Sequence, residues 1–125
     1  NIIVICYNIN IIKNRGVDKM NINEEITRLE RMSIMGGNKW TDFFKSEDEL
    51  IESLKNINLD FFDFKITNTP LIYCGVKGFG YIIPFSEQVK KGEGLTKKQM
   101  TQAKRLACQI KLAEVKSNDY FKNRI

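Results

Sequence analysis

Histidine is absent from the 125 residues, and cysteine, proline and tryptophan are scarce, at three, two and one residues. Histidine is the commonest general base and the commonest neutral metal ligand, so its absence excludes histidine-dependent hydrolases and most zinc sites. The cysteines Cys6, Cys74 and Cys108 have no metal-ligand spacing, and an odd number without a C-x-x-C pair argues against a disulfide framework. We expect neither a metal nor a cofactor, and a reducing cytoplasm suits these thiols.

Carboxylates are the remaining candidates for catalysis. Asp60 and Asp63 lie three apart in a strand-like run, where they would point to opposite faces and make a poor metal pair. The carboxylates between residues 47 and 52 come at the start of a helix, where they stabilise the positive end of its dipole. No Walker loop or dinucleotide fingerprint occurs. The sequence therefore predicts a protein that is not an enzyme.

The length and composition are those of one domain with a modest core, at 42% apolar and 28% charged residues. Residues 1–19 stand apart: they are apolar but broken by asparagines, too short to span a bilayer, and without the features of a signal peptide. Arg15-Gly16 could be encoded by a ribosome-binding sequence ahead of Met20. Residues 1–19 are accordingly either a translated leader foreign to the native protein or an edge strand, and residues 20–125 form a single α+β domain.

Charge is distributed unevenly over a chain of net charge +5. Residues 20–64 carry five Lys or Arg against ten Asp or Glu, whereas residues 65–125 carry twelve against four. This asymmetry predicts either pairing of the two halves within the fold or one cationic surface that meets a nucleic acid or an acidic protein. We expect no membrane partner, and the sequence leaves the oligomeric state open.

The fold class we predict is α+β. Asn21 or Asn23 caps a first helix that Gly36-Gly37 ends, and Ser46 to Glu49 forms a capping box for a short second helix. Trp40, between them, is either an anchor in the core or at its edge or an exposed anchor for a partner.

The aromatic and branched runs 59–67, 71–76 and 81–83 predict an antiparallel meander of three strands. Phe62, Phe64 and Ile66 would form the buried face of its first strand, and Pro84 would end its last.

A long amphipathic helix is predicted from the capping box Thr96 to Gln99 onward, packed across the sheet. Apolar residues recur on one face from Met100 to Ala113. Five cations, Lys97, Lys98, Lys104, Arg105 and Lys111, lie on the other, with no carboxylate before Glu114. They are either solvated surface lysines and arginine or a face that tracks phosphates.

The segment Lys77-Gly78-Phe79-Gly80-Tyr81-Ile82 resembles the K-G-F-G-(F/Y)-(I/V) core of cold-shock domains and of the first ribonucleoprotein motif of RNA-recognition domains. The resemblance covers six residues, with Pro84 at the motif's closing aromatic position. It implies a strand on which Phe79 and Tyr81 stack on bases. The alternative is a tight turn at Gly78 and Gly80, with Tyr81 packed inward.

Two functions follow as expectations. The first is a small nucleic-acid-binding accessory protein, with DNA or RNA undecided. The second is a protein-binding module or inhibitor that docks by charge complementarity, for example a phage-encoded inhibitor of a host nucleic-acid enzyme. The excess of Ile, Asn and Lys fits a low-GC bacterium, its phage or a mobile element. The candidate nucleic-acid-binding residues are Lys77, Phe79, Tyr81, Lys97, Lys98, Lys104, Arg105 and Lys111.

Overall fold

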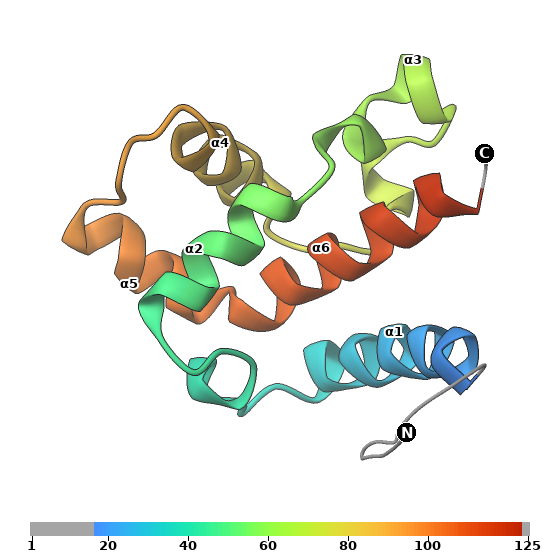
Figure 1. Ribbon diagram of the computed structural model, residues 1–125, viewed down its shortest axis with the longest axis horizontal. Helices are drawn as coiled ribbons and strands as arrows, with labels where there is room; N and C mark the ends of the chain where they lie inside the picture. Colours follow the sequence, from blue (N-terminus) through green and yellow to red (C-terminus); the bar gives the residue numbers. More distant parts are fainter. Residues whose placement is uncertain (1–16, 124–125) are drawn as a thin grey trace.

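The computed structural model describes residues 17–123, and within that range the chain is entirely helical (Figure 1). The predicted α+β fold with a three-stranded meander is therefore wrong. The elements are α1 (Val17–Met35), η1 (Trp40–Asp42), α2 (Glu47–Asn56), η2 (Leu59–Phe62), α3 (Phe64–Thr67), η3 (Leu71–Tyr73), α4 (Phe79–Lys90), α5 (Lys97–Arg105) and α6 (Ala107–Lys122). The predicted leader or edge strand at residues 1–19 lies outside the described residues, except that 17–19 belong to α1.

The two predicted N-terminal helices are confirmed. α1 begins at Val17, upstream of the asparagine caps we expected, and ends before Gly36, whose φ of 70° is the left-handed conformation that glycine favours. α2 is capped as predicted, because the Ser46 hydroxyl accepts a hydrogen bond from the Glu49 N–H at 3.2 Å. The Glu49 carboxylate, however, accepts from the N–H of Lys45 at 3.1 Å instead of closing the box on Ser46.

The first predicted strand, residues 59–67, forms η2 and α3 instead. The Asn58 side chain accepts from the Asp60 N–H at 3.1 Å, and the Asp63 side chain accepts from the Lys65 N–H at 2.9 Å. Such local side-chain caps compete with a strand ladder for the backbone N–H groups, and in this segment the caps form instead of the ladder. The predicted burial of this segment is also wrong in part. Phe62 is buried as expected, but Phe64 and Ile66, which we expected on the same buried face, are 55% and 53% exposed.

The other two predicted strands are also helical. Residues 71–76 form η3 and a short connection, and residues 81–83 lie inside α4. Gly78, at a φ of 76°, is the N-cap of α4, and Pro84 lies within that helix instead of ending a strand.

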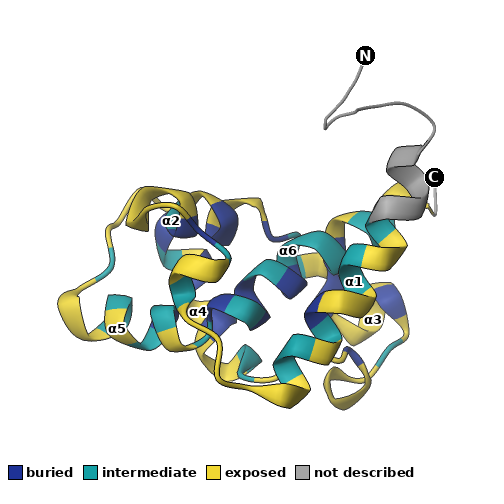
Figure 2. Cartoon of the chain, turned by 90° about the horizontal axis from the view of Figure 1, so that it is seen from below, coloured by how far each residue is buried: buried dark blue, intermediate teal, exposed yellow. Residues whose placement is uncertain are grey.

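The long C-terminal helix begins at Thr96 as predicted, but it is broken at Leu106. There the φ and ψ of −100° and 16° leave the helical region, so α5 and α6 are separate helices. α6 runs through the middle of the molecule, with α1 on one side and α2 on the other (Figure 1). Its Ile110, Leu112 and Ala113 have no exposed surface, and the dark blue of buried residues follows it in Figure 2. The helix thus packs between helices, and no sheet lies beneath it in the described part of the chain.

Between Val17 and Asn123, no helix has both the length and the apolar character required to cross a membrane.

Candidate nucleic-acid interface

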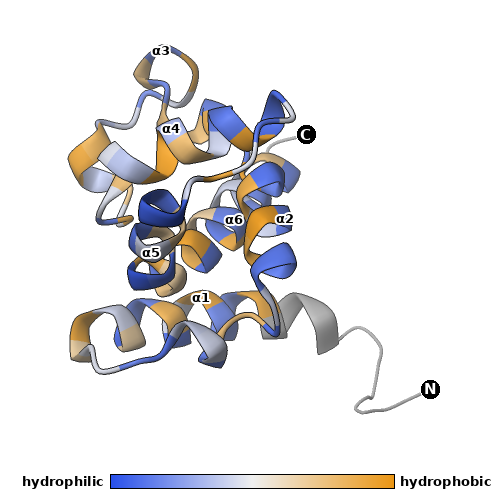
Figure 3. Ribbon diagram, turned by 90° about the vertical axis from the view of Figure 1, so that its left-hand side faces the viewer, coloured by the Kyte–Doolittle hydropathy of each residue, from blue (hydrophilic) through white to orange (hydrophobic). Residues whose placement is uncertain are grey.

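α5 lies at one end of the molecule and is its most hydrophilic helix by sequence, with four cations and no carboxylate in KKQMTQAKR (Figures 1 and 3). Ala103 is buried and Met100 is half-buried against the core, so one face of the helix is packed. Lys97, Lys98 and Arg105 are exposed. The predicted amphipathic character of this helix is therefore present in the structure.

Hydrogen bonds fix where α5 begins and how it meets α4. The capping box is complete: the Gln99 N–H donates to the Thr96 hydroxyl at 3.2 Å, and the Thr96 N–H donates to the Gln99 side chain at 2.9 Å. Gln88 of α4 exchanges side-chain hydrogen bonds with Gln99 and donates to the Gly94 carbonyl at 2.7 Å. The cations of α5 consequently project from a helix held in place at its N-terminus.

Lys104 is not a free cation. Its Nζ lies 2.6 Å from Oε2 of Glu47 in α2 and 4.7 Å from the centroid of the Trp40 ring. Trp40 itself is half-buried and packs against the core, as expected of an anchor at the core edge. The ion pair joins the basic half of the chain to the acidic half, and so does that of Lys116 with Glu30 at 3.2 Å.

Lys111 lies on α6, beyond the break at Leu106. Its Nζ is 3.7 Å from Oε1 of Glu114 and 5.8 Å from the centroid of the Phe44 ring. The lysines spaced seven apart therefore do not form one free stripe, because Lys104 and Lys111 both face the segment between Trp40 and Glu47. The sequence could show the pairing of Lys111 with Glu114, three residues on, but not the contacts with Trp40, Phe44 and Glu47, which lie more than fifty residues away.

The segment that resembles a ribonucleoprotein motif does not form the strand that the resemblance implies. Phe79 and Tyr81 lie in the first turn of α4, and at about 100° per residue they point in nearly opposite directions. Phe79 packs partly against the core, whereas Tyr81 is 55% exposed, with its ring centroid 6.3 Å from that of Phe85. Lys77 is exposed, and its N–H donates to the Gln109 side chain at 2.8 Å. Both the strand and the inward-packed Tyr81 are wrong.

A hollow of about 490 Å³ lies beside the first turns of α5. Lys97, Lys98 and Lys104 line it together with Glu47, and its apolar side comes from Leu95 and Met100. It brings three of the predicted cations to one concave surface, in which Glu47 is the single carboxylate.

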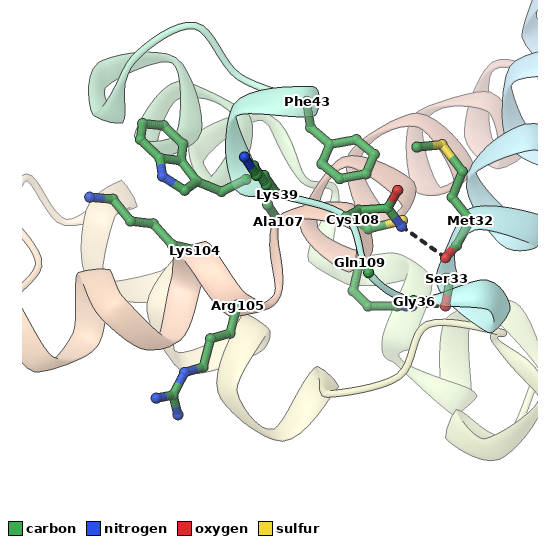
Figure 4. A pocket seen from close by; sticks show the side chains of 13 residues that line it. Met32, Ser33, Gly36, Lys39, Phe43, Lys104, Arg105, Ala107, Cys108 and Gln109 are labelled. Atoms are coloured by element: carbon green, nitrogen blue, oxygen red, sulfur yellow. Dashed lines mark hydrogen bonds between the residues drawn. The ribbon is translucent and has the colours of Figure 1, made fainter.

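A second pocket, of about 170 Å³, lies between the end of α1, η1 and the α5–α6 junction (Figure 4). Its wall includes Cys108, whose Sγ donates to the Leu29 carbonyl at 3.4 Å. Burial raises the pKa of the Cys108 thiol, an effect that the charge of Arg28 partly opposes. Gln109 lines the same pocket, but its amide is occupied by Lys77 and Ser33. No sequence signal marked this pocket, because its residues come from three separate elements.

No cluster of three or more Cys, Asp or Glu side chains that could hold a metal ion is found among residues 17–123.

Comparison with known proteins gives no match: no protein-family model, no curated protein and no solved structure is significantly similar to this chain.

Proposed function

We propose that this chain is a small non-enzymatic protein that binds nucleic acid through α5. One observation carries the proposal: α5 presents Lys97, Lys98 and Arg105 to solvent, and none of the three pairs with a carboxylate among the described residues. Exposed cations without internal partners are the side chains that can replace the counterions of a phosphate backbone.

The salt dependence of such binding follows from the number of free cations. Each neutralised phosphate lowers the logarithm of the affinity by about 0.9 per tenfold rise in salt on duplex DNA and by about 0.7 on single strands. Three free cations correspond to a slope of roughly −3 on duplex DNA. Such contacts are to the backbone, so the interaction is independent of base sequence.

The alternative function, docking on a protein by charge complementarity, has weaker support. Glu30 and Glu47, two of the carboxylates of the acidic half, are paired within the chain by Lys116 and Lys104. The carboxylates of α2 that form no ion pair among the described residues, Asp48, Glu49 and Glu52, share that helix with Lys55, whereas α5 carries its cations with no carboxylate. We include a cytoplasmic location in this proposal, because it suits both a nucleic-acid partner and the free thiols of Cys74 and Cys108.

Fluorescence anisotropy tests the proposal with labelled single-stranded DNA, single-stranded RNA and duplex DNA, each titrated over a series of salt concentrations. The variant is Lys97→Gln with Lys98→Gln. Its control is Lys55→Gln with Lys122→Gln, which removes the same charge from exposed lysines in the last turns of α2 and α6. We expect the α5 variant to reduce the salt slope on duplex DNA by about 1.8.

The control should retain the slope of the unmodified chain. The proposal is wrong if the unmodified chain does not bind at physiological salt, or if the control weakens binding as much as the α5 variant does.

A further inference from the structure

The concave surface beside α5 continues past Lys104 to Trp40. Lys104 lines both the hollow at the first turns of α5 and the pocket between α1, η1 and the α5–α6 junction, so the two are neighbours across that one side chain. Trp40 and Lys39 line the second of them, here called the Trp40 pocket, which extends from Lys104 to Met32 (Figure 4). The candidate interface therefore includes an aromatic ring as well as the cations of α5.

Positive charge predominates along both hollows. The described residues that line the Trp40 pocket include three cations and no carboxylate. The hollow beside α5 adds Lys97 and Lys98, with Glu47 as its single carboxylate. Lys39 and Arg105 are exposed, and neither forms an ion pair with another described residue. Five cations against one carboxylate favour a polyanion that runs from one hollow to the other.

The turn that carries Trp40 is held by its own hydrogen bonds. The N–H groups of Phe43 and Phe44 both donate to the Trp40 carbonyl at 3.1 Å. The Lys39 N–H donates to the Asp42 carboxylate at 2.9 Å. The Trp40 side chain is half-buried and packs against the core. The ring is thus positioned before any partner binds, which lowers the entropic cost of binding to it.

Lys104 covers the Trp40 ring in the unbound chain. Its Nζ lies 4.7 Å from the ring centroid and 2.6 Å from Oε2 of Glu47. An exposed ion pair and an exposed cation–π contact each change an equilibrium by about fivefold at most. A base stacked on an aromatic side chain changes affinity by about five- to hundredfold, and Lys104 is then free to pair with a phosphate of the same strand. The exchange therefore favours the base over the lysine.

An unpaired strand is the polyanion that offers such a base. The bases of a duplex stack on one another, whereas those of a single strand are free to stack on aromatic side chains beside a positively charged groove. The Trp40 pocket has a volume of about 170 Å³. A cavity of about 150 Å³ holds a benzene ring, so the pocket has room for the six-membered ring of a base.

We propose that the nucleic acid bound at α5 is single-stranded and that one of its bases stacks on Trp40. The phosphates of the strand lie along the cations from Lys97 to Lys39, and Lys104 moves from the ring to a phosphate. This inference rests on the proposed binding of nucleic acid through α5 and adds the class of nucleic acid that is bound. Single strands of DNA and RNA share the base and phosphate chemistry that it requires.

Trp40 is the only tryptophan of the chain, so intrinsic tryptophan fluorescence reports on its ring alone. The unmodified chain is titrated at physiological salt with oligo(dT), oligo(U) and a duplex DNA of equal length. We expect single strands to quench the fluorescence, because a stacked base contacts the indole, and the duplex to leave it unchanged. Quenching by either single strand supports the inference, and their relative affinities separate DNA from RNA.

Trp40→Leu is the variant that removes the stacking face, and its binding is followed by anisotropy of labelled strands. It should weaken the binding of single strands about five- to hundredfold and leave that of duplex DNA unchanged. Trp40→Phe keeps an aromatic face and should lose less. The matched control is Tyr73→Leu, because Tyr73 is 71% exposed and lines neither hollow, and this variant should bind as the unmodified chain does.

Unchanged duplex binding and far-ultraviolet circular dichroism show that Trp40→Leu is folded, and the fluorescence titration requires no variant. The inference is overturned if duplex DNA quenches Trp40 as strongly as single strands do, or if folded Trp40→Leu binds single strands as tightly as the unmodified chain. In either case the proposed function still stands if Lys97→Gln with Lys98→Gln reduces the salt slope. Absence of all nucleic-acid binding at physiological salt would overturn both.

Discussion

Gly78 and Gly80 lie two residues apart in the segment that resembles a ribonucleoprotein motif, yet alanine should affect the stability of the fold in opposite directions at the two positions. Gly78 is the N-cap of α4 at a φ of 76°, where an L side chain is strained. Gly80 is inside the helix with no positive φ, and a Cβ added to it meets no atom of another element within 4 Å.

The magnitudes follow from these environments. Gly78→Ala costs about 1–2 kcal/mol for the left-handed backbone. The new Cβ would also lie 2.8 Å from Cδ2 of Leu106, so the tip of that side chain must move. Gly80→Ala should stabilise the fold by about 0.4–1 kcal/mol, because alanine reduces the entropy of the unfolded chain and suits a helix.

Thermal and urea unfolding of the two single variants measure the difference. For a chain of this length, 1 kcal/mol corresponds to a shift of about 4 °C in Tm. We expect Gly78→Ala to lower Tm and Gly80→Ala to raise it. On an extended strand both glycines would lie on one face, and alanine would act in the same direction at both. Destabilisation by Gly80→Ala would refute the helical assignment of this segment.

Two further predictions concern Glu47 and the buried thiols. Glu47→Gln releases Lys104, so it should raise nucleic-acid affinity about two- to fivefold in anisotropy titrations, the worth of one exposed charge contact, whereas Glu52→Gln, which removes the same charge from α2, should not. Burial raises the pKa values of Cys74 and Cys108 above 9.0, so iodoacetamide should label both more slowly than a free cysteine at pH 8, as followed by peptide mass spectrometry. Labelling of both thiols as fast as that of a free cysteine at pH 8 would contradict this expectation. Because those pKa values are raised in the folded state, the stability that the thiols contribute is present below pH 9.0 and is lost as the pH rises above it, which urea unfolding at a series of pH values measures.

The elements that could be predicted are those with local signals. Thr96 with Gln99 and Ser46 with Glu49 are spacings that satisfy backbone N–H groups within one turn, so these two helix starts depend on neighbours in the sequence. Gly36 marks the end of α1 for the same kind of reason. Residues 59–83 carried a strand signal from their aromatic and branched composition, but that signal depends on a partner strand, which the described chain does not provide.

In the candidate site, too, the features that depend on neighbours in the sequence could be predicted, and those that depend on the packing of distant elements could not. That Lys97 and Lys98 are exposed follows from the apolar period of α5, which the sequence displays. That Lys104 is paired does not follow, because Glu47 lies 57 residues away and reaches Lys104 only once α2 and α5 have packed. The break at Leu106 likewise moves Lys111 off the face that an unbroken helix would have given it.

The sequence did not predict the exposure of Phe64, Ile66 and Ile72, for the same reason that it did not predict the helical fold. A strand ladder would have buried one face of residues 59–67, whereas short capped turns bury Phe61 and Phe62 and leave Phe64 and Ile66 outside. Apolar residues that a chain of this size leaves uncovered at one end lower its solubility unless another surface covers them. The cations of α5 lie at the opposite end, where the same covering would not reach them (Figure 1). The proposed phosphate binding by α5 should therefore be unaffected by substitutions among these apolar residues at the opposite end.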